Sequence, residues 1–277
     1  MSPIISELPS LSGDYPLSQE QISAFQRDGH ALLRGVCSPE EVEAYRKVIS
    51  DAAYKYNTET RPMEERDTYA KAFLQIMNLW TRDERVRKFV LARRFAKIAA
   101  DLMGVDAVRL YHDQALYKEG GGGHTPWHQD HYYWPLKTEG IKAVTMWMPL
   151  VDVPIEMGGL TFATGSHTEG FLGHLEISDK SHDEFDRLVA SRGFPISTAP
   201  MQAGDATFHA SWLLHSAPGN ASPNTREVMT VIYFADGVDT FEPDNEHRAN
   251  DLASWLPGVK AGQPAASELN PVVYRRE

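Results

Sequence analysis

A short segment near the middle of the chain, Pro126 to His131, contains side chains that bind metal ions. His128 and Asp130 are two positions apart, so on a β-strand both side chains would point to the same face. Imidazole and carboxylate groups are suitable ligands for first-row transition metals. Because such triplets also arise by chance, the segment predicts a metal site only together with a third ligand.

Candidates for that ligand follow much later in the chain. The turn Ala203 to Ala206 is predicted to enter a strand that carries both His209 and His215, and Arg226 lies on the next run. Two histidines and one carboxylate on one face of an octahedral metal leave three positions open, as in non-haem iron(II) oxygenases. The planar guanidinium of an arginine suits a bidentate grip on a carboxylate. The two segments together therefore predict an iron centre beside an anion site.

The elements that must position these residues begin with helices. Ser18 is placed to cap a helix that ends at Gly29, and Ser38 to cap a second helix, with a short strand over residues 30–36 between them. Residues 64–103 are predicted to be largely helical.

After residue 105 the pattern changes to short apolar or alternating runs separated by Gly, Pro and Asn. A surface helix is predicted within this part, at residues 178–193. Helices followed by many short strands predict a mainly β protein, with a double-stranded β-helix (jelly-roll, cupin-like) core and flanking N-terminal α-helices.

One domain is expected over residues 1–277, because no linker rich in glycine or in proline and serine divides the chain. Within it we predict a mainly helical flank at 17–104, the jelly-roll core with the metal site at 105–240, and a C-terminal extension at 241–277.

Several motifs, in this order along the chain, resemble those of the phytanoyl-CoA dioxygenase family of iron(II)/2-oxoglutarate enzymes. They are FQRDGHALLRGVCSPEEV, PWHQD, GGLTFATGSH, AGDATFHASWLLHSAPGN and Arg226, and they span roughly residues 20–236. The resemblance implies that His128, Asp130 and His215 bind iron(II). It also implies that Arg226 binds the 5-carboxylate of 2-oxoglutarate. In the family this arginine follows the last metal ligand by eleven residues, and that spacing favours His215 over His209 as the third ligand.

The resemblance also suggests residues around these groups. Those placed where family members line the cosubstrate pocket are Gln114, Gln129 and Trp147, with Lys71 and Gln75 as further polar contacts from the helical region. On a strand, His131 should point away from the metal face and toward the cavity entrance. We expect Tyr132, Tyr133 and Trp134 to line the substrate site, and core packing is the alternative role for them.

The implied reaction consumes O₂ and 2-oxoglutarate, releases succinate and CO₂, and hydroxylates an unactivated C–H bond, with ascorbate as a stimulant. We expect a small, largely apolar metabolite, for instance one of secondary metabolism. An acyl-CoA would need clustered Lys and Arg for its phosphates, whereas the chain has a net charge of −11. Two alternatives stay open: another cupin-type metal enzyme, such as a hydrolase or isomerase, and a noncatalytic binding module of the same fold.

Composition excludes other classes of function. The single cysteine, Cys37, allows no internal disulfide and no cysteine-rich zinc site. No basic cluster offers a nucleic-acid surface, and no apolar run reaches the roughly 20 residues of a membrane span. The N-terminal segment lacks the pattern of a signal peptide, so a cytoplasmic location is expected.

Overall fold

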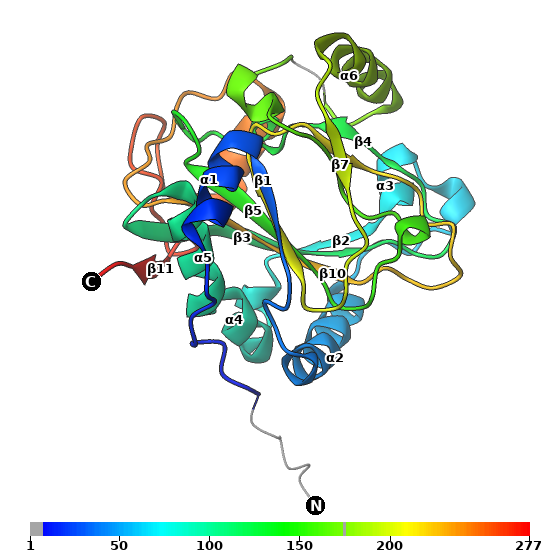
Figure 1. Ribbon diagram of the computed structural model, residues 1–277, viewed down its shortest axis with the longest axis horizontal. Helices are drawn as coiled ribbons and strands as arrows, with labels where there is room; N and C mark the ends of the chain where they lie inside the picture. Colours follow the sequence, from blue (N-terminus) through cyan, green and yellow to red (C-terminus); the bar gives the residue numbers. More distant parts are fainter. Residues whose placement is uncertain (1–7, 174–175) are drawn as a thin grey trace, which may run out of the picture.

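A computed structural model describes residues 8–173 and 176–277 of the protein (Figure 1). The α-helices are α1 (Gln19–Asp28), α2 (Pro39–Tyr56), α3 (Thr68–Ala72), α4 (Glu84–Val90), α5 (Arg93–Met103), α6 (Asp179–Arg192) and α7 (Glu246–Trp255), and a 3₁₀ turn, η3, covers Asp130–Tyr132. The strands are β1 (His30–Leu33), β2 (Leu74–Met77), β3 (Ala107–Tyr117), β4 (Thr125–His128), β5 (Ala143–Pro149), β6 (Thr161–Ala163), β7 (Ile196–Thr198), β8 (Ala206–Ala210), β9 (His215–Ala217), β10 (Val228–Ala235) and β11 (Val272–Arg275).

The predicted helix boundaries in the N-terminal part are confirmed. Ser18 and Ser38 each accept a hydrogen bond from the third residue of the helix that follows, and the side chain of that residue bonds back to the serine amide. Gly29 ends α1 with a φ of 79°, a left-handed conformation that glycine adopts at little cost. The predicted surface helix is confirmed as α6.

Within the described residues, the strands form two antiparallel sheets, which confirms the jelly-roll prediction (Figure 1). The larger sheet has the order β1-β8-β5-β10-β3-β11, and β2 pairs with the part of β3 that β11 leaves free. The smaller sheet has the order β4-β9-β6-β7. Helix α6 packs against β4, while α5 packs against β3, β5, β10 and β11 of the larger sheet.

The two faces of the larger sheet differ in chemistry. In β5, the side chains of Val144, Met146 and Met148 belong to the main apolar core, which the sheet shares with α2, α4 and α5. The alternate residues, Thr145 and Trp147, line a cavity on the opposite face. The same alternation in β10 places Thr230 and Ile232 at the cavity. Helices α2, α4 and α5 therefore pack on one face of the sheet, and the other face lines the cavity.

Of three expectations about local structure, one was wrong, and the structure adds detail to the other two. Residues 64–103 are largely helical, as predicted, except that residues 74–77 form β2, in which buried Leu74 and Ile76 alternate with less buried neighbours, and β2 pairs with the free edge of β3. His209 and His215 do not share one strand: β8 ends at Ala210, a turn follows, and β9 starts in the other sheet. The segment 241–277, predicted as a C-terminal extension, adds β11 to the larger sheet and brings α7 to the cavity.

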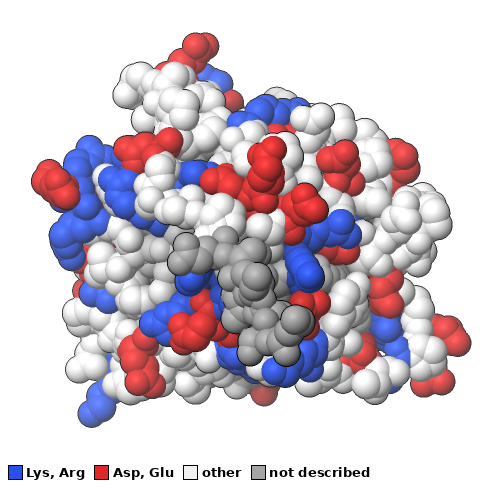
Figure 2. All heavy atoms as spheres, turned by 90° about the horizontal axis from the view of Figure 1, so that it is seen from below, with Lys and Arg blue, Asp and Glu red and all other residues white. Residues whose placement is uncertain are grey.

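The helices of the described residues do not include a membrane span. No helix in residues 8–173 or 176–277 combines the length and the apolar character needed to cross a bilayer. On the face shown in Figure 2, basic and acidic side chains are interspersed.

Candidate active site

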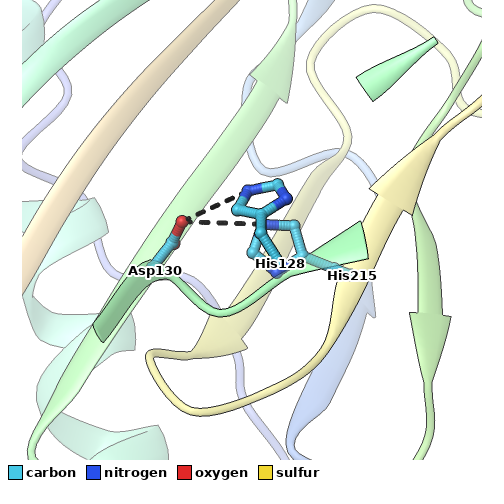
Figure 3. A group of neighbouring side chains, drawn as sticks. All are labelled: His128, Asp130 and His215. Atoms are coloured by element: carbon cyan, nitrogen blue, oxygen red, sulfur yellow. Dashed lines mark ion pairs between the residues drawn. The ribbon is translucent and has the colours of Figure 1, made fainter. Parts of the chain in front are cut away.

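The two predicted metal-binding segments meet between the sheets. His128, the last residue of β4, lies opposite His215, the first residue of β9, in the register of the smaller sheet. Asp130 extends its carboxylate toward both rings (Figure 3), with Oδ1 at 3.7 Å from Nε2 of His128 and 3.6 Å from Nε2 of His215. One ligand atom from each of the three residues lies within 4.8 Å of the others, a suitable arrangement for one metal ion.

The route by which Asp130 reaches this point differs from the prediction. Asp130 is not on the strand of His128, because β4 ends at His128 and Asp130 begins η3. The turn still directs the carboxylate to the side of the histidines.

Main-chain carbonyls fix the tautomers of the two histidines. Nδ1 of His128 lies 2.8 Å from the carbonyl oxygen of Pro126, and Nδ1 of His215 lies 3.0 Å from that of Leu213. A carbonyl oxygen only accepts hydrogen bonds, so each Nδ1 carries the hydrogen and each Nε2 keeps its lone pair for a metal. Burial lowers the pKa of His128 to about 3 and that of His215 to about 4, so both rings are neutral ligands at neutral pH.

Asp130 is held through its other oxygen. Oδ2 accepts a hydrogen bond of 2.7 Å from the hydroxyl of Thr145 on β5, and Nε2 of His209 lies 3.3 Å from the same oxygen. Burial raises the pKa of Asp130, but the neighbouring imidazoles, His215 first, lower it by more, so the carboxylate is ionised. His209 lacks the support of the other two rings, because its Nδ1 has no hydrogen-bond partner among the described residues. The geometry therefore fits a metal held by His128, Asp130 and His215, with His209 next to the other oxygen of the carboxylate.

A buried cation lies in the same cavity. Arg226 is 1 % exposed and its guanidinium carbon lies 5.2 Å from the ring centroid of Trp147. Its Nη1 donates to the carbonyl of Gly158, while its Nε has no partner. No carboxylate in the described part of the chain forms an ion pair with it. Burial lowers the pKa of Arg226 to about 9, so the group stays protonated at neutral pH and offers a charged site for an anion.

The cavity that contains these groups has a volume of about 550 Å³. Among the residues proposed from the sequence, those that line it besides the triad are Arg226, Gln114, Trp147, Gln75, Tyr133 and Trp134. Gln75 and Gln114 are linked, because Nε2 of Gln75 donates to Oε1 of Gln114 at 3.0 Å, and the hydroxyl of Tyr69 donates to Gln75. This chain of hydrogen bonds orients both amides along the cavity wall.

Two of the expected cosubstrate residues lie outside the lining. Gln129 lies between the ligands His128 and Asp130 in the sequence, but its side chain points away from the cavity. Its amide nitrogen donates hydrogen bonds to the carbonyls of Gly170 and Trp212. Lys71 contributes its main-chain carbonyl, which accepts from the amide of Gly123. Both contacts position loops around the site.

Two of the expected substrate residues lie outside the lining as well. His131 is 1 % exposed, and its Nε2 lies 2.8 Å from the carbonyl oxygen of Leu136. Tyr132 packs edge-on against Tyr133. The reason is that η3 replaces the expected strand, so the side chains after Asp130 do not alternate, and Tyr133 and Trp134 are the ones that reach the cavity.

Several lining residues were not identified from the sequence. They are Thr145 beside Asp130, His112 on β3, and a set on α7 with its last residue, namely His247, Asn250, Asp251, Ser254 and Trp255. The spacing of 247, 250, 251 and 254 is that of one helix face and could have indicated a polar surface on a C-terminal helix.

Comparison with known proteins agrees with this geometry. The model of the family described as phytanoyl-CoA dioxygenase (PhyH) matches residues 25–228. The chain belongs to the phytanoyl-CoA dioxygenase family. As expected from the sequence, it is a 2-oxoglutarate-dependent dioxygenase with iron as its metal. The family match includes the triad and Arg226 and ends before α7.

Individual relatives share the fold across most of their length. An ectoine dioxygenase from Nocardia farcinica is 24% identical over 243 residues, which cover 81% of this chain and 80% of that protein. The crystal structure of SnoK, a non-haem α-ketoglutarate-dependent carbocyclase from nogalamycin biosynthesis, has a TM-score of 0.74 at 23% identity and covers 94% of this chain and 99% of its own. The epimerase SnoN, solved with Fe³⁺, α-ketoglutarate and nogalamycin RO, has a TM-score of 0.74 at 24% identity, covering 92% and 98%.

Proposed function

We propose that this protein hydroxylates an unactivated C–H bond of a small metabolite, with release of succinate and CO₂. In this proposal His128, Asp130 and His215 bind iron(II), and Arg226 binds the 5-carboxylate of 2-oxoglutarate. The observation that carries it is the presence, in one cavity, of a triad with two free Nε2 lone pairs and of a buried arginine without an anionic partner.

Each residue has a defined task in this proposal. The carbonyls of Pro126 and Leu213 hold the two imidazoles in the metal-binding tautomer, and Thr145 orients the carboxylate of Asp130. Iron and 2-oxoglutarate, when bound, supply with O₂ the oxidising chemistry, and the protein orients the target bond and excludes water. Trp147 limits the space beside Arg226, and its ring stacks with the guanidinium.

The rest of the cavity supports a small substrate. Its apolar lining includes Phe73, Met77, Trp134 and Ile232, which suits a compact body with few charges. Arg226 is the one Lys or Arg among the lining residues, all of which belong to the described chain, so the phosphates of an acyl-CoA would find no second cation there. The relatives named above, which are named for ectoine or for nogalamycin biosynthesis, are consistent with a small molecule.

An anaerobic titration with iron(II) and then with 2-oxoglutarate tests the proposal. A visible charge-transfer absorption should appear only when both are present, because it requires 2-oxoglutarate to chelate the metal. A zinc-type hydrolase or a noncatalytic binding module should show no such band. Absence of the band in protein that binds iron would contradict the proposal.

A further inference from the structure

Helix α7 presents a polar face to the cavity. His247, Asn250, Asp251 and Ser254 all line the cavity, and the steps of three or four residues from 247 to the pair 250 and 251, and from that pair to 254, put them on one helix face. Leu252 packs into an apolar cluster on another side of the helix. A surface helix normally turns its polar face to bulk solvent and its apolar face to the protein. A polar face along a binding cavity therefore indicates a surface for ligand recognition.

Asp251 is the carboxylate on this helix face. Its Oδ2 accepts a hydrogen bond of 2.8 Å from the hydroxyl of Tyr111, which is fully buried, and Trp255 is a second donor. Burial raises the pKa of Asp251 to about 7. No Lys, Arg or His of the described chain forms an ion pair with this carboxylate. Above this pH the carboxylate is ionised, and its charge is hydrogen-bonded but has no ion-pair partner among the described residues.

A second, independent observation places an unsatisfied polar group in the same cavity. His112 is 1 % exposed, lines the cavity, and has an Nδ1 without a hydrogen-bond partner. Its ring centroid lies 5.4 Å from that of Trp255. Burial lowers the pKa of His112 to about 3, so the ring is neutral and supplies no charge to Asp251.

The charge balance of the cavity differs from end to end. Iron(II), the dianion of 2-oxoglutarate, Asp130 and Arg226 together carry no net charge. The remaining carboxylates among the lining residues are Glu176, whose Oε2 lies 3.0 Å from Nε2 of His247, and Asp251. Once the cosubstrate is bound, an ionised Asp251 therefore adds a negative charge at the substrate end that no second Lys or Arg of the cavity lining balances.

We propose that α7 is the substrate-recognition helix and that Asp251 binds a protonated amine of the substrate. This inference rests on the proposed function. The indole rings of Trp134 and Trp255 also line this end, and aromatic faces attract cationic nitrogen. An apolar body then extends past Ile232 toward Asp130, because Ile232 lies opposite Thr145, the residue that holds Asp130. A substrate with a carboxylate at this position would be repelled.

The test uses three probes with one ring and different head groups: cyclohexylmethylamine, cyclohexylmethanol and cyclohexanecarboxylate. Each is titrated by calorimetry at pH 8 into the full-length protein loaded anaerobically with iron(II) and 2-oxoglutarate. The amine should bind at least tenfold more tightly than the alcohol, and the carboxylate most weakly. Equal binding of the three, tighter binding of the alcohol or the acid, or no binding of the amine would overturn the proposal.

Two variants assign the preference to a residue. Asp251→Asn keeps an acceptor for Tyr111 but removes the charge, so it should lose the tenfold preference for the amine. Glu246→Gln removes the same charge from an exposed position on the same helix, outside the lining, and should keep the preference. Retention of the preference by Asp251→Asn would also overturn the proposal. If that variant does not fold, the comparison of head groups on the unmodified protein still decides.

The same samples separate this inference from the function on which it rests. The charge-transfer absorption reports iron and 2-oxoglutarate, and the calorimetry reports the amine. A chelate without amine binding contradicts only the role of Asp251. Amine binding without a chelate contradicts the proposed function instead.

Discussion

The two ends of the cavity are built in different ways. At the cosubstrate end, buried groups from both sheets converge, and their polar atoms are held by carbonyls and by Thr145. At the other end, a single helix supplies a row of polar side chains, of which Asn250 and Ser254 are exposed. The side chains at the first end are fixed by hydrogen bonds within the protein, whereas several side chains at the second end are exposed and have fewer contacts with the core.

In our proposals, the residues for the reaction and the residues for substrate selection therefore lie in different parts of the chain. The residues proposed to bind iron and 2-oxoglutarate lie within the segment 25–228 that matches the family, and α7 lies beyond it. Substrate selection can therefore change on α7 without any change in the residues that carry the reaction. The predictions below separate the two ends, from the largest expected effect to the smallest.

Removal of the third metal ligand should have the largest effect. His215→Ala leaves two protein ligands, so we expect iron(II) binding and turnover to be abolished, as measured by anaerobic calorimetry with iron. His209→Ala should retain iron binding, because His209 lies next to the other oxygen of the carboxylate and outside the triad. The reverse pattern would show that the third ligand is His209.

Arg226→Ala should act on the cosubstrate alone. Hydrogen bonds to charged groups contribute roughly 1.5–3 kcal/mol, so the affinity for 2-oxoglutarate should fall about 10- to 100-fold. Iron affinity should be unchanged, because Arg226 contacts Gly158 and Trp147 and not the triad. The intensity of the charge-transfer absorption as a function of 2-oxoglutarate concentration measures the change. An unaltered dissociation constant would rule out this assignment.

Thr145→Val removes the hydroxyl that orients Asp130 and preserves the shape of the side chain. Loss of a hydrogen bond to a metal ligand typically lowers metal affinity by about 10- to 100-fold, and we expect the lower value here. Thr230→Val is the matched control, because Thr230 also lines the cavity but its hydroxyl donates to the carbonyl of Gln114. If both variants bind iron equally well, Thr145 does not position the ligand.

The smallest effect concerns stability at the substrate end. Because burial raises the pKa of Asp251 from 3.8 to about 7, the folded protein loses stability as the pH rises through this interval. Asparagine does not ionise, so Asp251→Asn should be more stable than the unmodified protein at pH 8 by about 1 kcal/mol, a value reduced for partial solvent exposure. At pH 4 the difference should be close to zero. Urea unfolding at both pH values provides the measurement, and a variant less stable at pH 8 would show that Asp251 is a structural anchor.

The sequence was most informative where function depends on residue types at fixed spacing. The triad and Arg226 were identified from their motifs, and the structure brings them into one cavity. The helix starts at Ser18 and Ser38 were predictable because capping depends on local hydrogen bonds.

Long-range packing explains what the sequence did not predict. Whether residues 74–77 form a helix or a strand depends on the free edge of β3, which lies far away in the chain. The direction of His131 depends on η3, a local turn that a strand pattern does not predict. The role of α7 depends on where the chain returns after β10, and neither its charge nor its periodicity specifies that location.

The source of the two hydrogen bonds that set the histidine tautomers has a consequence for mutation. The acceptors are carbonyl groups of the peptide backbone at Pro126 and Leu213, which every amino acid provides. A point mutation at either position can change the side chain but cannot delete the acceptor. The orientation of Asp130, in contrast, depends on one hydroxyl group, which a single codon change can remove. In a library of random variants, substitutions that weaken iron binding should therefore be found far more often at Thr145 than at Pro126 or Leu213.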